Sequence, residues 1–285
     1  MGVLLGAVVA LTYGTADFLG GVSSRRLPVP VVLVAGQLAG LLLVAAVVAT
    51  TGGHDPTGTA LGHGAAAGLA SVVGLALFFQ GLAGGAMAVV APIAAVGSGV
   101  VPFGWAVAVG GERPGAVATA GVVLAVVGVA VVSRQASGGG PRPRAVDLAR
   151  AAGAGTAFGV VFVLLGDVGD DAGLVPVLAS RAVSVPLAAA WLVVHVARTG
   201  WRPPAAVRTG TTAALLVGQG VLDTTANAVF LAAADAGLVS EVSVVSALYP
   251  APTVILAALV LHERVSRSQR LGLALVLAGV GLIAT

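Results

Sequence analysis

The sequence contains no cysteine and no lysine, and it is poor in charge of either sign. Without cysteine the chain can form no disulfide, thiolate metal site or cysteine nucleophile. Charged residues make up only 9% of the 285 positions, whereas soluble domains carry about 25%, so they cannot cover a water-facing surface. All the basic residues are arginines, and all but Arg181 lie in short gaps between apolar runs, which excludes a basic face able to follow nucleic-acid phosphates.

Histidine is also scarce. The four histidines are scattered and lack the spacing of metal ligands (His54, His63, His195 and His262). We therefore predict no metal site, no cofactor and no catalytic residues. The absence of lysine also excludes a nucleotide-binding loop of the Gly-x-x-x-x-Gly-Lys-Ser/Thr type, and with it ATP hydrolysis by this chain.

Apolar residues dominate what is present: 58% of the chain is hydrophobic, with a mean hydropathy of +1.06. A bilayer core needs about 20 apolar residues per helix. The first run lacks a basic start and contains Asp17, so it is predicted to be a helix and not a signal peptide. The sequence thus predicts an all-α integral membrane protein with ten transmembrane helices, at about 3–22, 29–50, 60–81, 86–109, 115–133, 148–166, 173–195, 210–233, 238–261 and 269–284.

Part of the sequence occurs twice. Residues 79–130 reappear, changed but recognisable, 151 positions later; the matches are Phe79 with Phe230, Ala83 with Ala234, Glu112-Arg113 with Glu263-Arg264, Gly121 with Gly272, and Gly128 with Gly279. A polar Gly- and Pro-rich linker at 134–147 predicts a first repeat at 1–133 and a second at 148–285. Each repeat holds five helices. Because five is odd, two similar halves must enter the membrane in opposite orientations, as in many secondary transporters.

The arginines are concentrated in alternate loops. Loops after even-numbered spans contain only Arg113, and loops after odd-numbered spans contain twelve: Arg25, Arg26, Arg134, Arg142, Arg144, Arg150, Arg198, Arg202, Arg208, Arg264, Arg267 and Arg270. Positive residues favour the cytoplasmic side of a membrane. We therefore expect a multi-pass protein of the cell membrane with cytoplasmic odd-numbered loops and both termini outside.

Three segments resemble a known family. The segment 13–21 (YGTADFLGG) is similar to the first helix of EamA-like proteins of the drug/metabolite transporter superfamily. The stretch from 248–253 (LYPAPT) to 262–264 (HER) resembles that family's Pro-containing helix and its Gly-Glu-Arg-like turn, and the Gly272–Gly279 helix is similar to its closing helix. The first copy departs from the pattern, with Gly99 in place of Pro250. The resemblance implies a ten-helix exporter or permease of small metabolites that works by alternating access. Many relatives are drawn with cytoplasmic termini, whereas the arginines here favour the opposite.

Three ionisable residues lie within the predicted spans: Asp17, Arg181 and Asp223. An ionised group at mid-bilayer costs roughly 2.5–3.5 kcal/mol on insertion scales, so such groups usually face a cavity or a partner. Gln219, Asp223 and Asn227 are spaced four apart and share one helix face. We predict that this stripe is a substrate-facing wall. The alternative is a hydrogen-bond ladder that only joins helices.

Arg181 and Asp223 are expected at equal depth on consecutive helices, roughly 12–15 Å from the outer end at 1.5 Å per residue. Equal depth predicts an ion pair. One hypothesis is that a polar or zwitterionic substrate competes for the pair, and the other is a permanent structural pair.

Asp17 has no charged counterpart in the second copy, where Phe162 occupies the matching position. An unmatched acid breaks the symmetry of the repeat, as a proton-carrying site would, so proton coupling through Asp17 is a hypothesis. Its alternatives are a helix cap near Arg25 and Arg26, or a simple interhelical hydrogen bond.

Gln37 aligns with Arg181 at an offset of 144, so one pocket position is neutral in one half and cationic in the other. Aromatic side chains can supply pocket walls, or else core packing and an interfacial belt; they are Tyr13, Trp105, Phe158 and Tyr249. The predicted substrate-binding residues are Tyr13, Asp17, Gln37, Arg181, Gln219, Asp223, Asn227 and Tyr249.

Proline and glycine mark expected bends and close packing. Three proline pairs are predicted to interrupt the fourth, seventh and ninth spans: Pro92 and Pro102, Pro176 and Pro186, and Pro250 and Pro252. The spaced pairs Gly121 with Gly128 and Gly272 with Gly279 predict close packing of the fifth and tenth spans, within the bundle or across a homodimer.

The leading prediction is a secondary transporter, an exporter, of a small polar or amphipathic metabolite, whose partners are that substrate and the lipid bilayer. The alternative is a membrane-embedded enzyme acting on lipid or isoprenoid substrates. Such an enzyme needs clustered acids, histidines or a nucleophile–base pair, and here those groups are dispersed. A sensor or assembly partner is the third alternative, which long tails or a soluble domain would favour.

Overall fold

The computed structural model describes residues 1–51, 57–84, 87–109, 115–134, 144–168, 172–203, 210–236, 239–262 and 267–283. Within them the regular structure is helical throughout, as predicted. The helices are α1 (Gly2–Ser24), α2 (Val29–Thr51), α3 (Gly58–Ala83), α4 (Met87–Ala108), α5 (Ala116–Arg134), α6 (Ala145–Gly166), α7 (Val175–Thr199), α8 (Gly210–Asp235), α9 (Val239–Ser246), α10 (Pro250–Val260) and α11 (Arg267–Ile283).

Among the described residues, six helices are long and apolar enough to cross a membrane: α1, α2, α3, α6, α7 and α8. A helix satisfies its own backbone hydrogen bonds, which is what a chain immersed in lipid requires. Nine of the ten predicted spans each correspond to one helix, with ends that differ by a few residues. Most of the predicted linker, and the repeated Glu112-Arg113 and Glu263-Arg264 pairs, lie outside the described residues.

The ninth predicted span forms two helices instead of one. A turn at 247–249 separates α9 from α10, and Pro250 is the first residue of α10. Proline has no backbone N–H and is well suited to the first turn of a helix, so the helix restarts there. The Thr253 hydroxyl donates to the carbonyl of Tyr249 at 3.0 Å and to that of Gly14 in α1 at 2.9 Å. The hydrogen bond to Gly14 therefore joins the break between α9 and α10 to α1.

The other prolines do not divide their helices. Pro92 and Pro102 lie inside a continuous α4, and Pro186 lies inside a continuous α7. Pro176 lies in the first turn of α7, where a missing N–H breaks no intrahelical bond. The predicted interruptions of the fourth and seventh spans are therefore wrong, because neighbouring groups can accommodate a proline within a buried helix.

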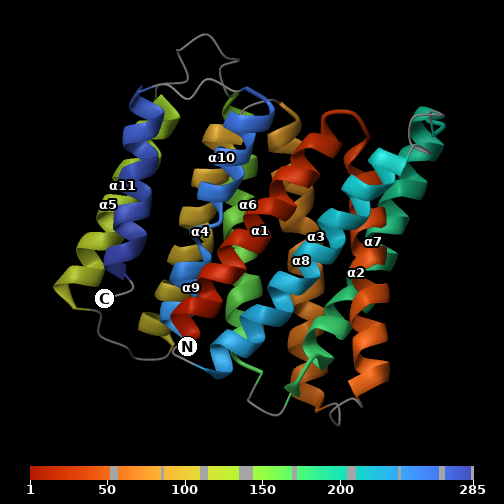
Figure 1. Ribbon diagram of the computed structural model, residues 1–285, viewed down its shortest axis with the longest axis horizontal. Coiled ribbons are helices and arrows are strands. Elements are labelled where there is room, and N and C mark those ends of the chain that lie inside the picture. The colour runs from red at the N-terminus through yellow and green to blue at the C-terminus, as the bar shows by residue number, and fades with distance from the viewer. Residues whose placement is uncertain are drawn as a thin grey trace.

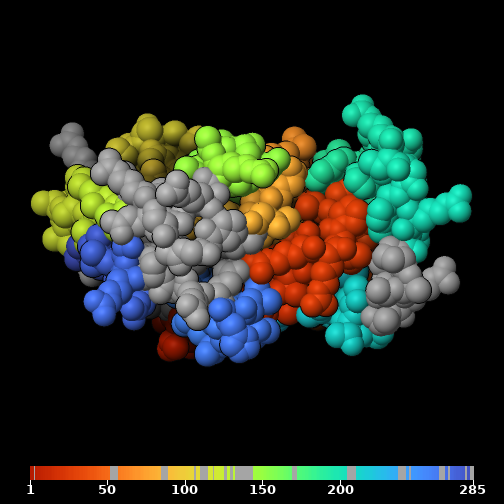
Figure 2. Space-filling model, turned by 90° about the horizontal axis from the view of Figure 1, so that it is seen from above, coloured from red at the N-terminus to blue at the C-terminus, as the bar shows by residue number. Residues whose placement is uncertain are grey.

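The bundle is elongated, with α5 and α11 side by side at one extremity and α7 at the other (Figures 1 and 2). A Cβ added at Gly128 of α5 would lie 2.8 Å from the carbonyl oxygen of Gly272 in α11 and 2.7 Å from the nitrogen of Val276. The two backbones meet because glycine has no side chain. The close packing predicted for the fifth and tenth spans thus occurs within one chain.

Glycine also brings α2 and α8 together. A Cβ on Gly220 would overlap the carbonyl group of Gly36, and a Cβ on Gly40 would overlap the hydroxyl of Thr224 and come within 3.3 Å of the Arg181 Nε. Only glycine permits this approach. The crossing fixes α8 against α2 at the level of its polar residues, and so positions the candidate site.

Candidate functional site

The polar stripe of α8 faces the interior of the bundle. Gln219, Asp223 and Asn227 are 2%, 5% and 8% exposed. The stripe therefore lies inside the bundle and not against lipid. Its members have different surroundings, however. Gln219 packs against Gly36 of α2, whereas the amide nitrogen of Asn227 donates to the backbone carbonyl of Asp223 at 2.8 Å, within α8.

Arg181 and Asp223 form the predicted ion pair. The guanidinium Nη2 donates to Asp223 Oδ2 at 2.5 Å, and Nη1 donates to Gln37 Oε1 at 2.5 Å. Ser184, one turn along α7, donates to the same Gln37 oxygen at 2.6 Å. Arg181 and Gln37 are each 1% exposed. Three helices, α2, α7 and α8, are therefore joined through one buried cation.

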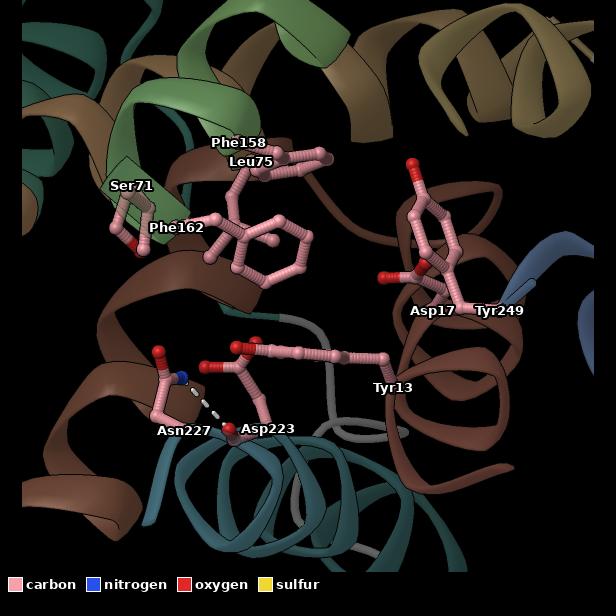
Figure 3. Close-up of a pocket in the computed structure, with 10 residues that line it drawn as sticks. Tyr13, Asp17, Ser71, Leu75, Phe158, Phe162, Asp223, Asn227 and Tyr249 are labelled. Atoms are coloured by element: carbon pink, nitrogen blue, oxygen red, sulfur yellow. Dashed lines mark hydrogen bonds between the residues drawn. The ribbon is translucent and has the colours of Figure 1, made fainter. Parts of the chain in front are cut away.

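The carboxylate and not the guanidinium of this pair borders open space. A narrow cavity lies between α1, α3, α6, α8 and the break at Tyr249, and Asp223 is in its wall (Figure 3). The free volume at its centre is about 30 Å³, room for no more than a few water molecules. This cavity, as the described residues form it, has no room for a drug-sized molecule, so a larger ligand needs its helices to separate. The lining residues are Tyr13, Asp17, Ser71, Leu75, Phe158, Val161, Phe162, Asp223, Asn227 and Tyr249.

The cavity has a polar side and an apolar side. From α1 and α8 come Asp17, Asp223 and Asn227, and Tyr13 reaches across toward Asp223 (Figure 3). The opposite side, from α3 and α6, is apolar apart from the Ser71 hydroxyl; it consists of Leu75, Phe158, Val161 and Phe162. Such a lining suits a molecule with one charged or polar end and one hydrophobic end.

The aromatic rings form a connected wall. Phe162 lies 6.1 Å from Tyr13, centroid to centroid, and stacks on Phe230 at 4.7 Å. Phe158 meets Phe78 edge-on at 5.6 Å. The rings at the cavity are thus held in place by rings of the core behind them.

Asp17 is a buried acid of α1. It is 5% exposed, and it makes no hydrogen bond or ion pair with any residue that the structure describes. Its carboxylate points into the cavity beside the ring of Tyr249 (Figure 3). The Tyr249 hydroxyl lies near Ser98, yet makes no hydrogen bond of standard geometry within the described residues. The helix-cap alternative for Asp17 fails, because Asp17 lies in the interior of α1, a full turn and more before its end at Ser24.

Five of the eight predicted substrate-binding residues line this cavity: Tyr13, Asp17, Asp223, Asn227 and Tyr249. Gln37, Arg181 and Gln219 do not; they lie behind it, in the contacts of α2 with α7 and α8. Phe158 is a lining aromatic as expected, whereas Trp105 is 50% exposed and lies elsewhere. The prediction omitted four lining residues, for which the sequence offers no signal beyond helical periodicity and, at Phe162, the match to Asp17: Ser71, Leu75, Val161 and Phe162.

Positions matched by the repeat meet in this cavity. Tyr13 aligns with Phe158, and Asp17 aligns with Phe162, at one offset of 145. All four side chains line the same space. Equivalent positions of α1 and α6 therefore face each other across it, with the acid on one side only.

Comparison with known proteins identifies one family. Residues 149–285 match the profile of the EamA-like transporter family. A crystal structure aligns over 99% of this chain and 95% of its own, with a TM-score of 0.69 and 19% sequence identity. At that identity the likeness concerns the fold. No curated protein matches the sequence.

Proposed function

We propose that the chain is a secondary transporter, an exporter of small polar or amphipathic metabolites, on the premise that residues 149–285 match the EamA-like transporter family. The observation that carries the proposal is the two-sided cavity at the meeting of α1, α3, α6 and α8, which contains a buried acid with no partner among the described residues. In membrane carriers, ligand sites characteristically lie between helices near the middle of the bilayer.

The proposed mechanism is alternating access between two inverted five-helix halves. Its support is that helix contacts occur in equivalent pairs when α1–α5 are exchanged for α6–α11. α1 packs on α8 as α6 packs on α3, and α4 packs on α6 as α9 and α10 pack on α1. α2 packs on α8 as α7 packs on α3, and α1 and α6 run in opposite directions (Figure 1). If one half rocks against the other, the two halves can exchange these packings, and the cavity then opens to the other side of the membrane.

The proposed orientation places the arginine-rich end in the cytoplasm of a cell-membrane protein. The helix ends that carry the described arginines are the C-termini of α1, α5 and α7 and the N-termini of α6 and α11, and they lie opposite the two chain termini (Figure 1). A cysteine introduced at Thr199 should react with an impermeant maleimide from the cytoplasmic side only. Reaction from outside alone would reverse the orientation.

The transport role predicts a specific effect of filling the cavity. Val161 is 6% exposed and lines the space, while its neighbour Val160 is 37% exposed on the outer face of α6. In proteoliposomes tested against a labelled metabolite panel, at least one compound should enter with wild-type protein. Its uptake should be abolished by Val161→Phe and retained with Val160→Phe, both checked for monodispersity. Equal uptake with the two folded variants would contradict the role of this cavity.

Proton coupling through Asp17 is the proposed energy source. A cavity-lining carboxyl with no cation beside it can carry a proton in place of cargo. Asp17→Asn should therefore leave downhill exchange of the cargo measurable but remove its response to an imposed pH gradient. If the variant still accumulates cargo in response to that gradient, proton coupling must reside elsewhere.

A further inference from the structure

The charges around the cavity do not balance. Among its lining residues Asp17 and Asp223 are acidic and none is basic. Arg181 lies behind the cavity wall, where its guanidinium forms an ion pair with Asp223 at 2.5 Å. With both acids ionised, the guanidinium compensates the charge of Asp223 and leaves that of Asp17 uncompensated.

Asp17 is placed to receive a cation. An ionised carboxylate in a low-dielectric interior is costly unless it is paired or hydrogen-bonded. This one has no described partner and points into the space. An anionic cargo would add to the unfavourable charge, and a neutral cargo would leave it uncompensated. A cationic cargo would offset it.

The remaining walls favour the same class of ligand. Aromatic faces attract ammonium groups within about 6 Å of the ring centroid, and most strongly where water is excluded. Tyr13 and Tyr249 lie on the side of Asp17 (Figure 3), and Phe158 and Phe162 lie opposite. Leu75, with these two phenylalanines, offers contact to an apolar body and holds no charge.

We propose that the cargo is an amphipathic organic cation, an ammonium group on an aromatic or apolar body, with the ammonium at Asp17 and the body against α3 and α6. This inference rests on the proposed transport function and names its substrate class. It also assigns separate roles to the two acids: Asp17 contacts the ammonium, and Asp223 is held by Arg181 as part of the wall.

A matched set of three probes tests the class: 2-phenylethylammonium, 2-phenylethanol and phenylacetate, which share a ring and differ in charge. Binding to detergent-solubilised full-length protein is followed by ligand-dependent thermal stabilisation. The cation should bind at least roughly 30-fold more tightly than the alcohol, the ratio that corresponds to about 2 kcal/mol for a buried charge pair. Asp17→Asn should remove this preference. Asp167→Asn, which makes the same chemical change at an exposed helix end, should retain it.

A second measurement needs no variant, and so does not depend on Asp17→Asn folding. Dicyclohexylcarbodiimide modification at Asp17, quantified by mass spectrometry of the wild-type protein, should be suppressed by 2-phenylethylammonium and unaffected by the alcohol. The proposal is overturned if the alcohol or the acid binds as tightly as the cation, if none of the three binds, or if the cation does not protect Asp17. A protein that transports another compound of the panel in a Val161-dependent way would then remain a transporter with a different substrate class. Failure of all transport would instead remove the proposed function.

Discussion

Two buried aspartates border one cavity, and their neighbours give them different roles. Asp223 is fixed by the Arg181 guanidinium, which is itself held by Gln37. Asp17, across the space on α1, has no partner among the described residues and is the group available to a proton or a ligand. A membrane protein retains such costly groups chiefly where they act.

The ion pair predicts an asymmetric response to neutralisation. Asp223→Asn leaves a cation whose side chain is 1% exposed, whereas Arg181→Gln leaves a carboxylate that borders the cavity. Removing one partner of a buried pair costs about 3–5 kcal/mol. We expect both variants to unfold at lower temperature, with the larger loss for Asp223→Asn, and the double variant to be less destabilised than the sum of the two. Strictly additive losses in a thermal unfolding assay would show that the pair is not coupled.

The pairing of Arg181 with Asp223 was predictable from their equal depth on consecutive spans. Which polar residues line the cavity and which are buried behind it was not predictable from the sequence. Sequence fixes the depth of Gln37 and Gln219 along their helices, but the rotation of α2 and α8 about their axes depends on the glycine crossing at Gly36 and Gly220.

At the scale of elements, glycine determines which helices touch. α2 and α8 meet where Gly36 and Gly220 leave room for each other's backbone, and α5 and α11 meet at Gly128 and Gly272. The span boundaries were predictable because lipid requires long apolar helices. Which proline divides a helix was not predictable. Pro102 and Pro250 each remove one backbone N–H donor, and they differ only in their surroundings.

The α2–α8 crossing predicts a sharp contrast between two glycines. A Cβ at Gly220 would overlap the backbone of Gly36, which cannot move aside as a flexible side chain can, whereas a Cβ at Gly62 of α3 meets nothing within 4 Å. Gly220→Ala should destabilise by about 1–3 kcal/mol or more. Gly62→Ala should be neutral or stabilising by up to about 1 kcal/mol. Equal effects of the two on thermal unfolding would mean that the helices do not approach so closely.

At the scale of the whole molecule, alternating access requires a cavity that opens to both sides of the membrane in turn. In the proposed mechanism, the equivalent helix contacts of α1–α5 and α6–α11 correspond to two related arrangements, and the small free volume of the cavity means that cargo enters only as helices move. The repeated sequence is the basis of the proposed two-half organisation. The cavity itself was not predictable from the sequence, because it depends on which faces of α1, α3, α6 and α8 converge.

The most direct measurement uses the absence of cysteine from the natural chain. Ser71, 9% exposed, lines the cavity, and Leu69 on the same helix is 54% exposed on the outer face of the bundle. A single cysteine at each position is treated with a membrane-impermeant maleimide in right-side-out and in inverted vesicles. The account predicts that the cysteine at 71 is labelled from both sides and that the cysteine at 69, surrounded by lipid, is labelled from neither. Labelling of position 71 from one side only, or from neither, would contradict alternating access to this cavity.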